Sequence, residues 1–315
     1  MKFVLVVCSS KAHSSEWSIS QKTAENVAEA LLSSGFEVKI LHDDDVNLID
    51  EILSLKPYAV FNATHGSYGE DGLLRKYISD RADVNITHSG VYTSAICVDK
   101  DKAKKCAEFI GVPVAPSEKK LFKEFLARGT NVEIPYVVKP NKEGSSIGCY
   151  LIRDAQDLDN IRLDENTEIL IEKYISGREF SVGVLNGRVL EVTEICPKGE
   201  FYDYRSKYEQ GGSDHILPAD ISQELRDEMK FYTKQMYDFL GCKGPARVDF
   251  RYNSIDGVVM LEINNQPGMT KTSLLPEQAA YLGCSFEQLC VDILDAAHGE
   301  NDEQVLKDKM EPLFD

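Results

Sequence analysis

Two apolar runs in the last third of the chain, residues 246–252 and 258–263, constrain the fold most strongly. The turn sequence Ser-Ile-Asp-Gly at 254–257 separates them, so together they predict an antiparallel β-hairpin. A shift of one residue would move every side chain to the opposite face of the hairpin. A loop with an even number of residues is favoured, because an odd number would place carboxylates on the buried face. A loop of 254–257 pairs Asn253 with Val258.

This register sorts the side chains of the hairpin into two faces. It places Asp249 opposite Glu262, and Arg247 opposite Asn264, on the same face. The other face then collects the apolar side chains, namely Val248, Phe250, Tyr252, Val259, Leu261 and Ile263.

The polar face of the hairpin suits a hard cation. Two carboxylates and an amide oxygen are ligands that Mg²⁺ accepts, and Arg247 would stand beside the ion as a positive fork. The competing interpretation is an ordinary solvated face of an edge hairpin. Residues 264–270 favour the binding site, because a Pro-Gly turn there lets backbone N–H groups approach a ligand closely.

Composition limits the classes of function. The chain has 315 residues, enough for about two domains by length alone, and 43% of them are hydrophobic. Its net charge of −17 argues against a surface that follows nucleic-acid phosphates. Eight cysteines without a C-x-x-C pair indicate reduced thiols and a cytoplasmic protein. The apolar run at 3–7 is too short for a signal sequence, and no run is long enough to span a membrane.

The first third of the chain alternates strands and helices. We expect strands at 3–7, 36–41 and 58–62, helices at 23–32 and 48–55, and a polar loop at 9–20. This order predicts a parallel βαβαβ sheet, which binds ligands at the carboxyl ends of its strands. Glu16 and the Gly-rich segment after His65 both fall at that edge. A structural and a catalytic role for His65 are equally favoured.

A new unit begins near residue 95. A Lys-rich helix at 99–110 precedes a buried strand that ends at Lys139, and the loop at 141–148 contains Gly and Ser residues that could close over phosphates. This loop is not a Walker A motif. Without a ligand it would be an ordinary hairpin loop.

The remaining segments complete the chain. Strands are expected at 168–175 and 180–185, and helices at 222–240 and 276–297. Glu172 and Lys173 interrupt an apolar strand and could read a base edge, although Lys173 could equally face solvent. Residues 199–218 have glycines and little periodicity, which predicts a long surface loop and a candidate lid.

Several blocks, in order, resemble the D-alanine–D-alanine ligase family of the ATP-grasp superfamily. They are HGSYGEDG at 65–72, HSGVYTSAICVDKDKAK at 88–104, VVKPNKEGSSIG at 137–148, LIEKYISGREF at 170–180, FYDYRSKY at 201–208, RVDF at 247–250, LEINNQPGMT at 261–270 and SLLP at 273–276. The resemblance implies a mixed α/β and α+β protein, an ATP-grasp fold with an N-terminal parallel α/β domain. The domains would span residues 1–95, 96–178 and 179–315, the last carrying the metal site and the lid at 199–218.

The resemblance also implies roles for individual residues. The metal ligands, for two Mg²⁺ or Mn²⁺ ions, would be Asp249, Glu262 and Asn264. ATP would contact Lys100, Lys139, Glu172, Lys173, Tyr174, Ile175, Glu179 and Lys207. D-Alanine would be held by Glu16, His65, Ser273 and Leu274. Glu16 would link through Ser145 to Tyr208, and Arg247 with the N–H of Gly268 would form an oxyanion hole.

The implied activity joins two D-alanine molecules at the cost of ATP, through an acyl phosphate. Alternatives are a D-alanine–D-lactate ligase or another carboxylate–amine ligase, which Tyr208 would discriminate, and a regulatory module that binds ATP without turnover. Cys8 to Lys11 stand where the family often has Gly-Gly, which leaves the placement of the loop around Glu16 open. We expect a homodimer, with no nucleic-acid or membrane partner.

Overall fold

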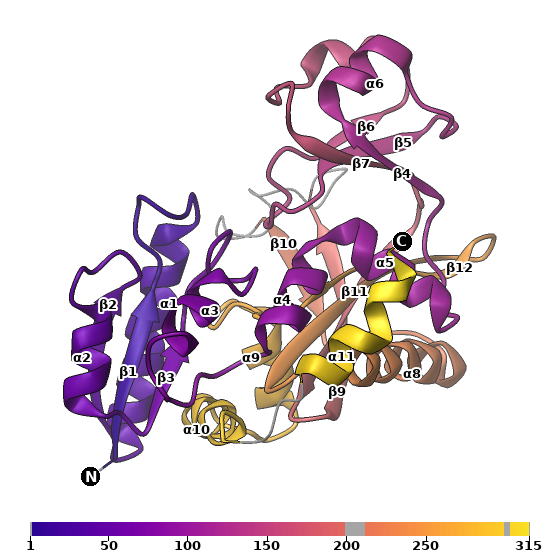
Figure 1. Ribbon diagram of the computed structural model, residues 1–315. Helices are drawn as coiled ribbons and strands as arrows, with labels where there is room; N and C mark the ends of the chain where they lie inside the picture. Colours follow the sequence, from indigo (N-terminus) through magenta and orange to yellow (C-terminus); the bar gives the residue numbers. More distant parts are fainter. Residues whose placement is uncertain (1, 199–211, 299–302, 315) are drawn as a thin grey trace.

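The computed structural model describes residues 2–198, 212–298 and 303–314, and its described strands form three sheets. Figure 1 shows an N-terminal unit beside a large sheet, with a smaller sheet above the large one. The mixed architecture and the parallel N-terminal sheet confirm the predicted fold class.

The N-terminal sheet is parallel, in the order β2-β1-β3. Its elements are β1 (Phe3–Cys8), α1 (Trp17–Ser33), β2 (Glu37–His42), α2 (Leu48–Leu55) and β3 (Ala59–Asn62), followed by α3 (Leu73–Ser79). The predicted loop at 9–20 is wrong at its end, since α1 begins at Trp17. The buried face of this first turn carries Ser20, whose hydroxyl accepts from Ser9 N at 2.7 Å and donates to Ala63 O at 2.8 Å. A buried polar residue there hid the helical periodicity.

The small upper sheet is antiparallel, in the order β4-β7-β5-β6. It consists of β4 (Ser117–Leu121), β5 (Tyr136–Pro140), β6 (Tyr150–Ile152) and β7 (Glu168–Lys173), and α6 (Phe122–Arg128) packs against it. Phe122, Phe125 and Tyr136 lie in its apolar core. Strand β4, rich in lysine, was not predicted.

The large sheet is antiparallel, in the order β10-β9-β8-β11-β12. Its strands are β8 (Arg178–Leu185), β9 (Arg188–Pro197), β10 (Ser213–Ile216), β11 (Pro245–Asn253) and β12 (Gly257–Asn264). One core joins the sheet to α4 (Val91–Val98), α5 (Lys100–Phe109), α8 (Gln223–Phe239) and α11 (Glu303–Met310). A second core joins it to α1, β1, α9 (Leu274–Tyr281) and α10 (Phe286–Ala296), and so connects the N-terminal unit to the rest.

Two expected segments differ from the structure. The single helix predicted at 276–297 is two helices, because the chain turns at Gly283, whose φ is +82°, and Ser285 caps the second helix through Gln288 N at 3.2 Å. The predicted lid at 199–218 is partly a strand, since 213–216 form β10 against β9. Residues 199–211 lie outside the described part of the chain.

The β11–β12 hairpin keeps the predicted polar pairs but not the predicted loop. Asp249 pairs with Glu262, and Arg247 with Asn264. At the turn, however, Asn253 pairs with Gly257, so the loop has one residue fewer than expected. A bulge after Asp249 accommodates the difference.

The bulge also changes which side chains face the large core near the turn. Val258 and Met260 lie in that core, whereas Val259 packs separately with Ala115 and Ile175, and Leu261 lines a cavity. The expected placement of Val259 and Leu261 beside Phe250 was therefore wrong. The odd loop and the bulge compensate for each other, so that Asp249 still pairs with Glu262.

The cysteines form no disulfide among the described residues. All eight cysteines are free, and Cys8, Cys97, Cys106, Cys242 and Cys290 are buried. Within the described ranges, no helix combines the length and apolar character that crossing a bilayer requires.

Phe250 is fully buried at the centre of the large core, which predicts a strong effect of truncation. Phe250→Ala should lower the free energy of unfolding by about 3–5 kcal/mol, through lost apolar contact and a residual cavity. Ile255→Ala, at the 92% exposed tip of the same hairpin, should change it by less than about 0.5 kcal/mol. Urea denaturation of both variants measures the difference, and equal values would contradict this assignment of the core.

Candidate functional site

Two adjoining cavities lie beside the large sheet, the first facing the N-terminal unit and the second facing the small sheet. Their volumes, open mouths included, are about 970 and 720 Å³. Lys100, Glu143 and Glu262 line both cavities and form the wall that they share. A group bound in one cavity therefore lies next to a group bound in the other.

The structure brings every predicted site residue that it describes to one of these cavities. The first cavity is lined by Glu16, His65, Lys100, Ser145, Arg247, Glu262, Asn264, Gly268, Ser273 and Leu274. The second is lined by Lys100, Lys139, Glu172, Lys173, Tyr174, Ile175, Glu179, Asp249 and Glu262. Lys207 and Tyr208 fall outside the described residues.

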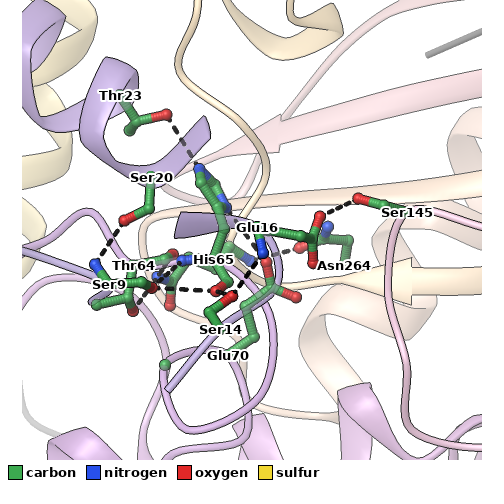
Figure 2. A network of polar contacts seen from close by, with 12 residues as sticks. Ser9, Ser14, Glu16, Ser20, Thr23, Thr64, His65, Glu70, Ser145 and Asn264 are labelled. Atoms are coloured by element: carbon green, nitrogen blue, oxygen red, sulfur yellow. Dashed lines mark hydrogen bonds and ion pairs between the residues drawn. The ribbon is translucent and has the colours of Figure 1, made fainter. Parts of the chain in front are cut away.

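A hydrogen-bonded network holds His65 in the wall of the first cavity (Figure 2). Thr23 Oγ1 lies 3.0 Å from its Nε2, and Glu70 Oε1 lies 3.2 Å from its Nδ1. Ser9 and Ser14 hydroxyls donate to its backbone carbonyl at 3.1 and 2.6 Å. The ring orientation is therefore fixed by the protein from both sides.

Glu16 stands at the amino end of α1, where the loop after β1 becomes helix. It is 4% exposed, its N–H donates to Ser14 Oγ at 3.0 Å, and its carboxylate accepts a hydrogen bond from Ser145 Oγ. Figure 2 shows this link between Glu16 and Ser145. The link connects the N-terminal unit to the glycine-rich loop after β5. It forms although residues 8–11 differ from the Gly-Gly that the family often has there.

Charged groups of the hairpin, of α5 and of the loop after β5 gather at the shared wall and beside it. Arg247 donates to both carboxylate oxygens of Asp249, at 2.9 and 2.8 Å, and Ser181 Oγ donates to the same carboxylate at 2.7 Å. Lys100 Nζ donates to Glu143 O at 2.6 Å and lies 3.8 Å from Glu262 Oε2. This lysine therefore projects between the cavities.

The donor chemistry of the hairpin fits a hard divalent cation. Asp249 and Glu262 are cross-strand partners, and Asn264 follows two residues later on the same face. All three offer oxygen, as Mg²⁺ and Mn²⁺ prefer. In the described ranges, no cluster of three or more His, Cys, Asp or Glu side chains could hold a metal by itself. An ion here would need the amide oxygen and further oxygens from water or a ligand.

A buried carboxylate between two buried lysines dominates the second cavity. Glu172, which is 4% exposed, accepts from Lys139 Nζ at 2.6 Å and also from Lys104 Nζ. Burial alone would raise the pKa of Glu172, but the two ammonium groups outweigh it and lower the pKa to about 2. The cluster therefore carries an excess positive charge inside a protein that is acidic overall.

The outer part of the second cavity contains a further ion pair. Arg251 donates to Glu179 Oε2 at 2.8 Å, and both side chains are buried. Its guanidinium carbon lies 5.4 Å from the centre of the Tyr174 ring. Lys173, whose role was left open, is exposed and pairs with Asp256 at 2.7 Å.

Sequence reasoning missed three charged residues at the site. Lys104 and Glu70 lie inside blocks that were recognised, but neither was assigned a role, and Arg251 follows the RVDF block directly. Helical spacing could have indicated Lys104, because it lies one turn after Lys100 on α5. The ion pairs themselves depend on contacts between distant strands, which no local pattern contains.

An N-terminal parallel unit followed by two sheets that enclose a lysine-lined cavity defines an ATP-grasp ligase. A structure of D-alanine–D-alanine ligase from Bacillus anthracis complexed with ATP has a TM-score of 0.78 and 25% identity, covering 98% of this chain and 99% of that one. Among curated proteins, D-alanine–D-alanine ligase of Ruegeria sp. (strain TM1040) is 40% identical over 291 residues, 91% of this chain and 94% of that protein.

Two further comparisons agree. Residues 105–295 match the family model described as D-ala D-ala ligase C-terminus. D-alanine–D-alanine ligase of Zymomonas mobilis is 38% identical over 304 residues, 93% of this chain and 94% of that protein. The chain belongs to the D-alanine–D-alanine ligase family.

The lowered pKa of Glu172 predicts an acid dependence of stability. An unfolded glutamate titrates near 4.5 and the folded one near 2, so its stabilising contribution is complete above about pH 5 and is lost as the pH falls toward 2. The loss for the parent is on the order of 3 kcal/mol. Glu172→Gln removes this titration, so its unfolding free energy should fall less steeply below pH 5.

Urea denaturation at a series of pH values checks this prediction. The matched control is Glu168→Gln, an exposed carboxylate on the same strand, whose pH dependence should follow that of the parent. Identical slopes for the parent and Glu172→Gln would show that the two lysines do not hold this carboxylate ionised.

Proposed function

We propose that this protein joins two D-alanine molecules to D-alanyl-D-alanine, converting ATP to ADP and phosphate, and so supplies a precursor of peptidoglycan. The observation that carries the proposal is the wall shared by the two cavities. Lys100 and Glu262 line both cavities. The other residues of one cavity are expected to hold ATP, and those of the other cavity are expected to hold D-alanine. The 40% identity to curated D-alanine–D-alanine ligases supports the same activity.

The first step activates a carboxylate, which is a poor electrophile. The γ-phosphoryl group of ATP in the second cavity passes to the carboxylate of a D-alanine in the first, forming an acyl phosphate and ADP. Lys100 and Lys139, with Lys207, neutralise charge on the phosphates. Glu16 binds the ammonium group of this D-alanine. The hydrogen bond from Ser145 holds the side-chain carboxylate of Glu16 in place.

Asp249, Glu262 and Asn264 would hold two Mg²⁺ or Mn²⁺ ions. A divalent ion there would supply charge neutralisation on the transferred phosphoryl group. Arg247 orients the Asp249 carboxylate through two hydrogen bonds. Glu172, Lys173, Tyr174, Ile175 and Glu179 would then hold the nucleoside end of ATP.

The second step is attack by the amine of another D-alanine on the acyl phosphate. Ser273 and the backbone at Leu274 bind the carboxylate of this second substrate. Arg247 and the N–H of Gly268 stabilise the oxyanion, an interaction worth about 3–4 kcal/mol per donor in comparable sites. Because water would destroy the acyl phosphate, we infer that the segment 199–218 helps to exclude it.

The proposal extends to the domain organisation, the cellular compartment and the oligomeric state. The ligase would have three domains, dividing near residues 95 and 178, and would act in the cytoplasm as a homodimer without a nucleic-acid or membrane partner. The free thiols support a reducing compartment. Helices α4 and α5 pack on the large sheet, so the central unit would grip ATP through Lys100 at the start of α5, its small sheet and the flanking loops.

A change of second substrate is the alternative with a specific observation behind it. The VanG D-Ala:D-Ser ligase from Enterococcus faecalis has a TM-score of 0.78 and 26% identity, covering 94% of this chain and 99% of that one. The fold alone therefore accommodates different second substrates. Tyr208 is the residue that we expect to favour D-alanine.

Phosphate release measured with ATP and single substrates tests the function. D-Alanine should give fast release and a dipeptide product. D-Lactate or D-serine, offered with limiting D-alanine, should give mixed product in at most about a tenth of the amount of dipeptide. A site that forms a hydrogen bond to one substrate binds a substrate without that bond less tightly, by about 1.4 kcal/mol or more. L-Alanine should give none. Preferential formation of a mixed product would identify the alternative, and ATP binding without any turnover would identify a regulatory module.

Glu262→Gln should abolish ligation while the fold remains, since the amide lacks the charge that a metal ligand supplies. We expect a loss of at least about 100-fold in kcat, comparable to removing one stabilising group from a transition state. Asp249→Asn should raise the metal concentration that gives half-maximal activity. Asp214→Asn, on the exposed edge strand of the same sheet, is the control and should keep parental rates. Near-normal turnover of Glu262→Gln at saturating Mg²⁺ would exclude it as a ligand.

A further inference from the structure

A buried amide, Gln266, fastens the segment between β12 and α9 to the N-terminal unit. Its Nε2 donates to Thr64 O at 2.5 Å and to Thr64 Oγ1 at 3.2 Å. Its Oε1 accepts from Asn62 Nδ2 at 3.1 Å. All three side chains are at most 5% exposed, so water cannot readily replace these bonds.

The partners of Gln266 form the stem of the loop that carries His65. Asn62 ends β3, and its Oδ1 accepts from Thr64 Oγ1 at 2.6 Å and from Thr64 N at 3.2 Å. The loop returns tightly over this stem, because a Cβ on Gly69 would lie 1.9 Å from Thr64 Oγ1. The stem therefore fixes the loop whose His65 and Glu70 line the first cavity.

On its own side, Gln266 belongs to the loop proposed to stabilise the oxyanion. Its backbone N–H donates to Asn264 Oδ1 at 2.7 Å, and Gly268 follows two residues later. A Cβ on Gly268 would lie 2.9 Å from Ser273 Oγ, so this loop is also closely packed. Gln266 is not among the residues that line either cavity, so any effect on the reaction must pass through its neighbours.

We propose that Gln266 is a positioning residue. It holds the loop at 264–270, which contains Gly268, against the loop at 65–72, which contains His65. This inference rests on the proposed ligase activity. The two loops come from different units, and the second amine must reach an acyl phosphate held between them. When the loops separate, water attacks the acyl phosphate, the bond between acyl carbon and phosphate oxygen breaks, and D-alanine and phosphate are released. ATP is then hydrolysed without dipeptide formation.

The test is the ratio of ADP to dipeptide. Gln266→Met keeps the length of the side chain but leaves Asn62 Nδ2 and Thr64 O without this partner. The kcat/KM for dipeptide formation should fall about 5- to 100-fold, the range expected for unpaired buried polar groups. ADP formation that depends on D-alanine should fall less, so that ADP clearly exceeds dipeptide. Gln266→Glu, which keeps the volume and the acceptor for Asn62, should raise the ratio in the same direction and provides a second variant if Gln266→Met does not fold.

Two comparisons separate positioning from simple loss of stability. Gln278, on α9, is an equally buried amide whose side chain bonds to the large sheet, at Gly183 N, Ser181 O and Thr193 Oγ1. Gln278→Met should lower the melting temperature but leave one ADP per dipeptide. Asn62→Leu should reproduce the uncoupling. The double variant Asn62→Leu/Gln266→Met should be less impaired than the two single effects added together, because both substitutions remove the same contact.

The outcomes distinguish this inference from the proposed function. A parent protein that releases no ADP in response to D-alanine would overturn the ligase activity itself. A parent with one ADP per dipeptide, together with Gln266→Met and Gln266→Glu variants that keep this ratio, would overturn only the role of Gln266. Uncoupling equal to that of Gln278→Met would do the same.

Discussion

The cross-strand pairing of Asp249 with Glu262 is the contact on which the rest of the site depends. It sets one face of the β11–β12 hairpin toward the cavities, while Val248, Phe250 and Ile263 enter the large core on the other. Apolar burial on that core face, about 1.5–3 kcal/mol for each large side chain, fixes the register far more strongly than the polar groups could. The hydrophobic core thus holds two carboxylates side by side in spite of their mutual repulsion. Arg247 and Lys100 then offset their charge.

Charge inside the protein has the opposite sign to its overall charge. The chain carries a net charge of −17, yet Lys100, Lys104 and Lys139 are all buried around the second cavity. Burying an ammonium group is costly unless a partner accompanies it, and Glu172 is that partner for two of them. One carboxylate for two lysines leaves a positive charge available for an anionic ligand. A triphosphate fits this arrangement, and the similar D-alanine–D-alanine ligase from Bacillus anthracis has been crystallised with ATP.

Much of this could be predicted from the sequence, for reasons that differ between elements. Alternation along β11 and β12 placed Asp249 opposite Glu262 correctly, because a buried face leaves little freedom of register. The loop length was wrong, and the bulge that compensates for it has no sequence signal in this chain. The start of α1 was missed because Ser20 is a polar residue buried by hydrogen bonds. Strand β10 was missed because His215 and Asp214 do not alternate with apolar residues. The contacts of Lys104 and Gln266 join segments far apart in the chain, and only the fold brings them together.

The proposed activity depends on the transfer of a phosphoryl group across the wall between the cavities to the carboxylate of D-alanine. Turnover of ATP with D-alanine labelled by oxygen-18 in its carboxylate tests this directly, because amide formation from an acyl phosphate leaves a carboxylate oxygen on the departing phosphate. The phosphate, analysed by mass spectrometry, should carry a single oxygen-18 atom for each dipeptide formed. Unlabelled phosphate accompanying labelled dipeptide would contradict the account, since the carboxylate would then have been activated without accepting the phosphoryl group.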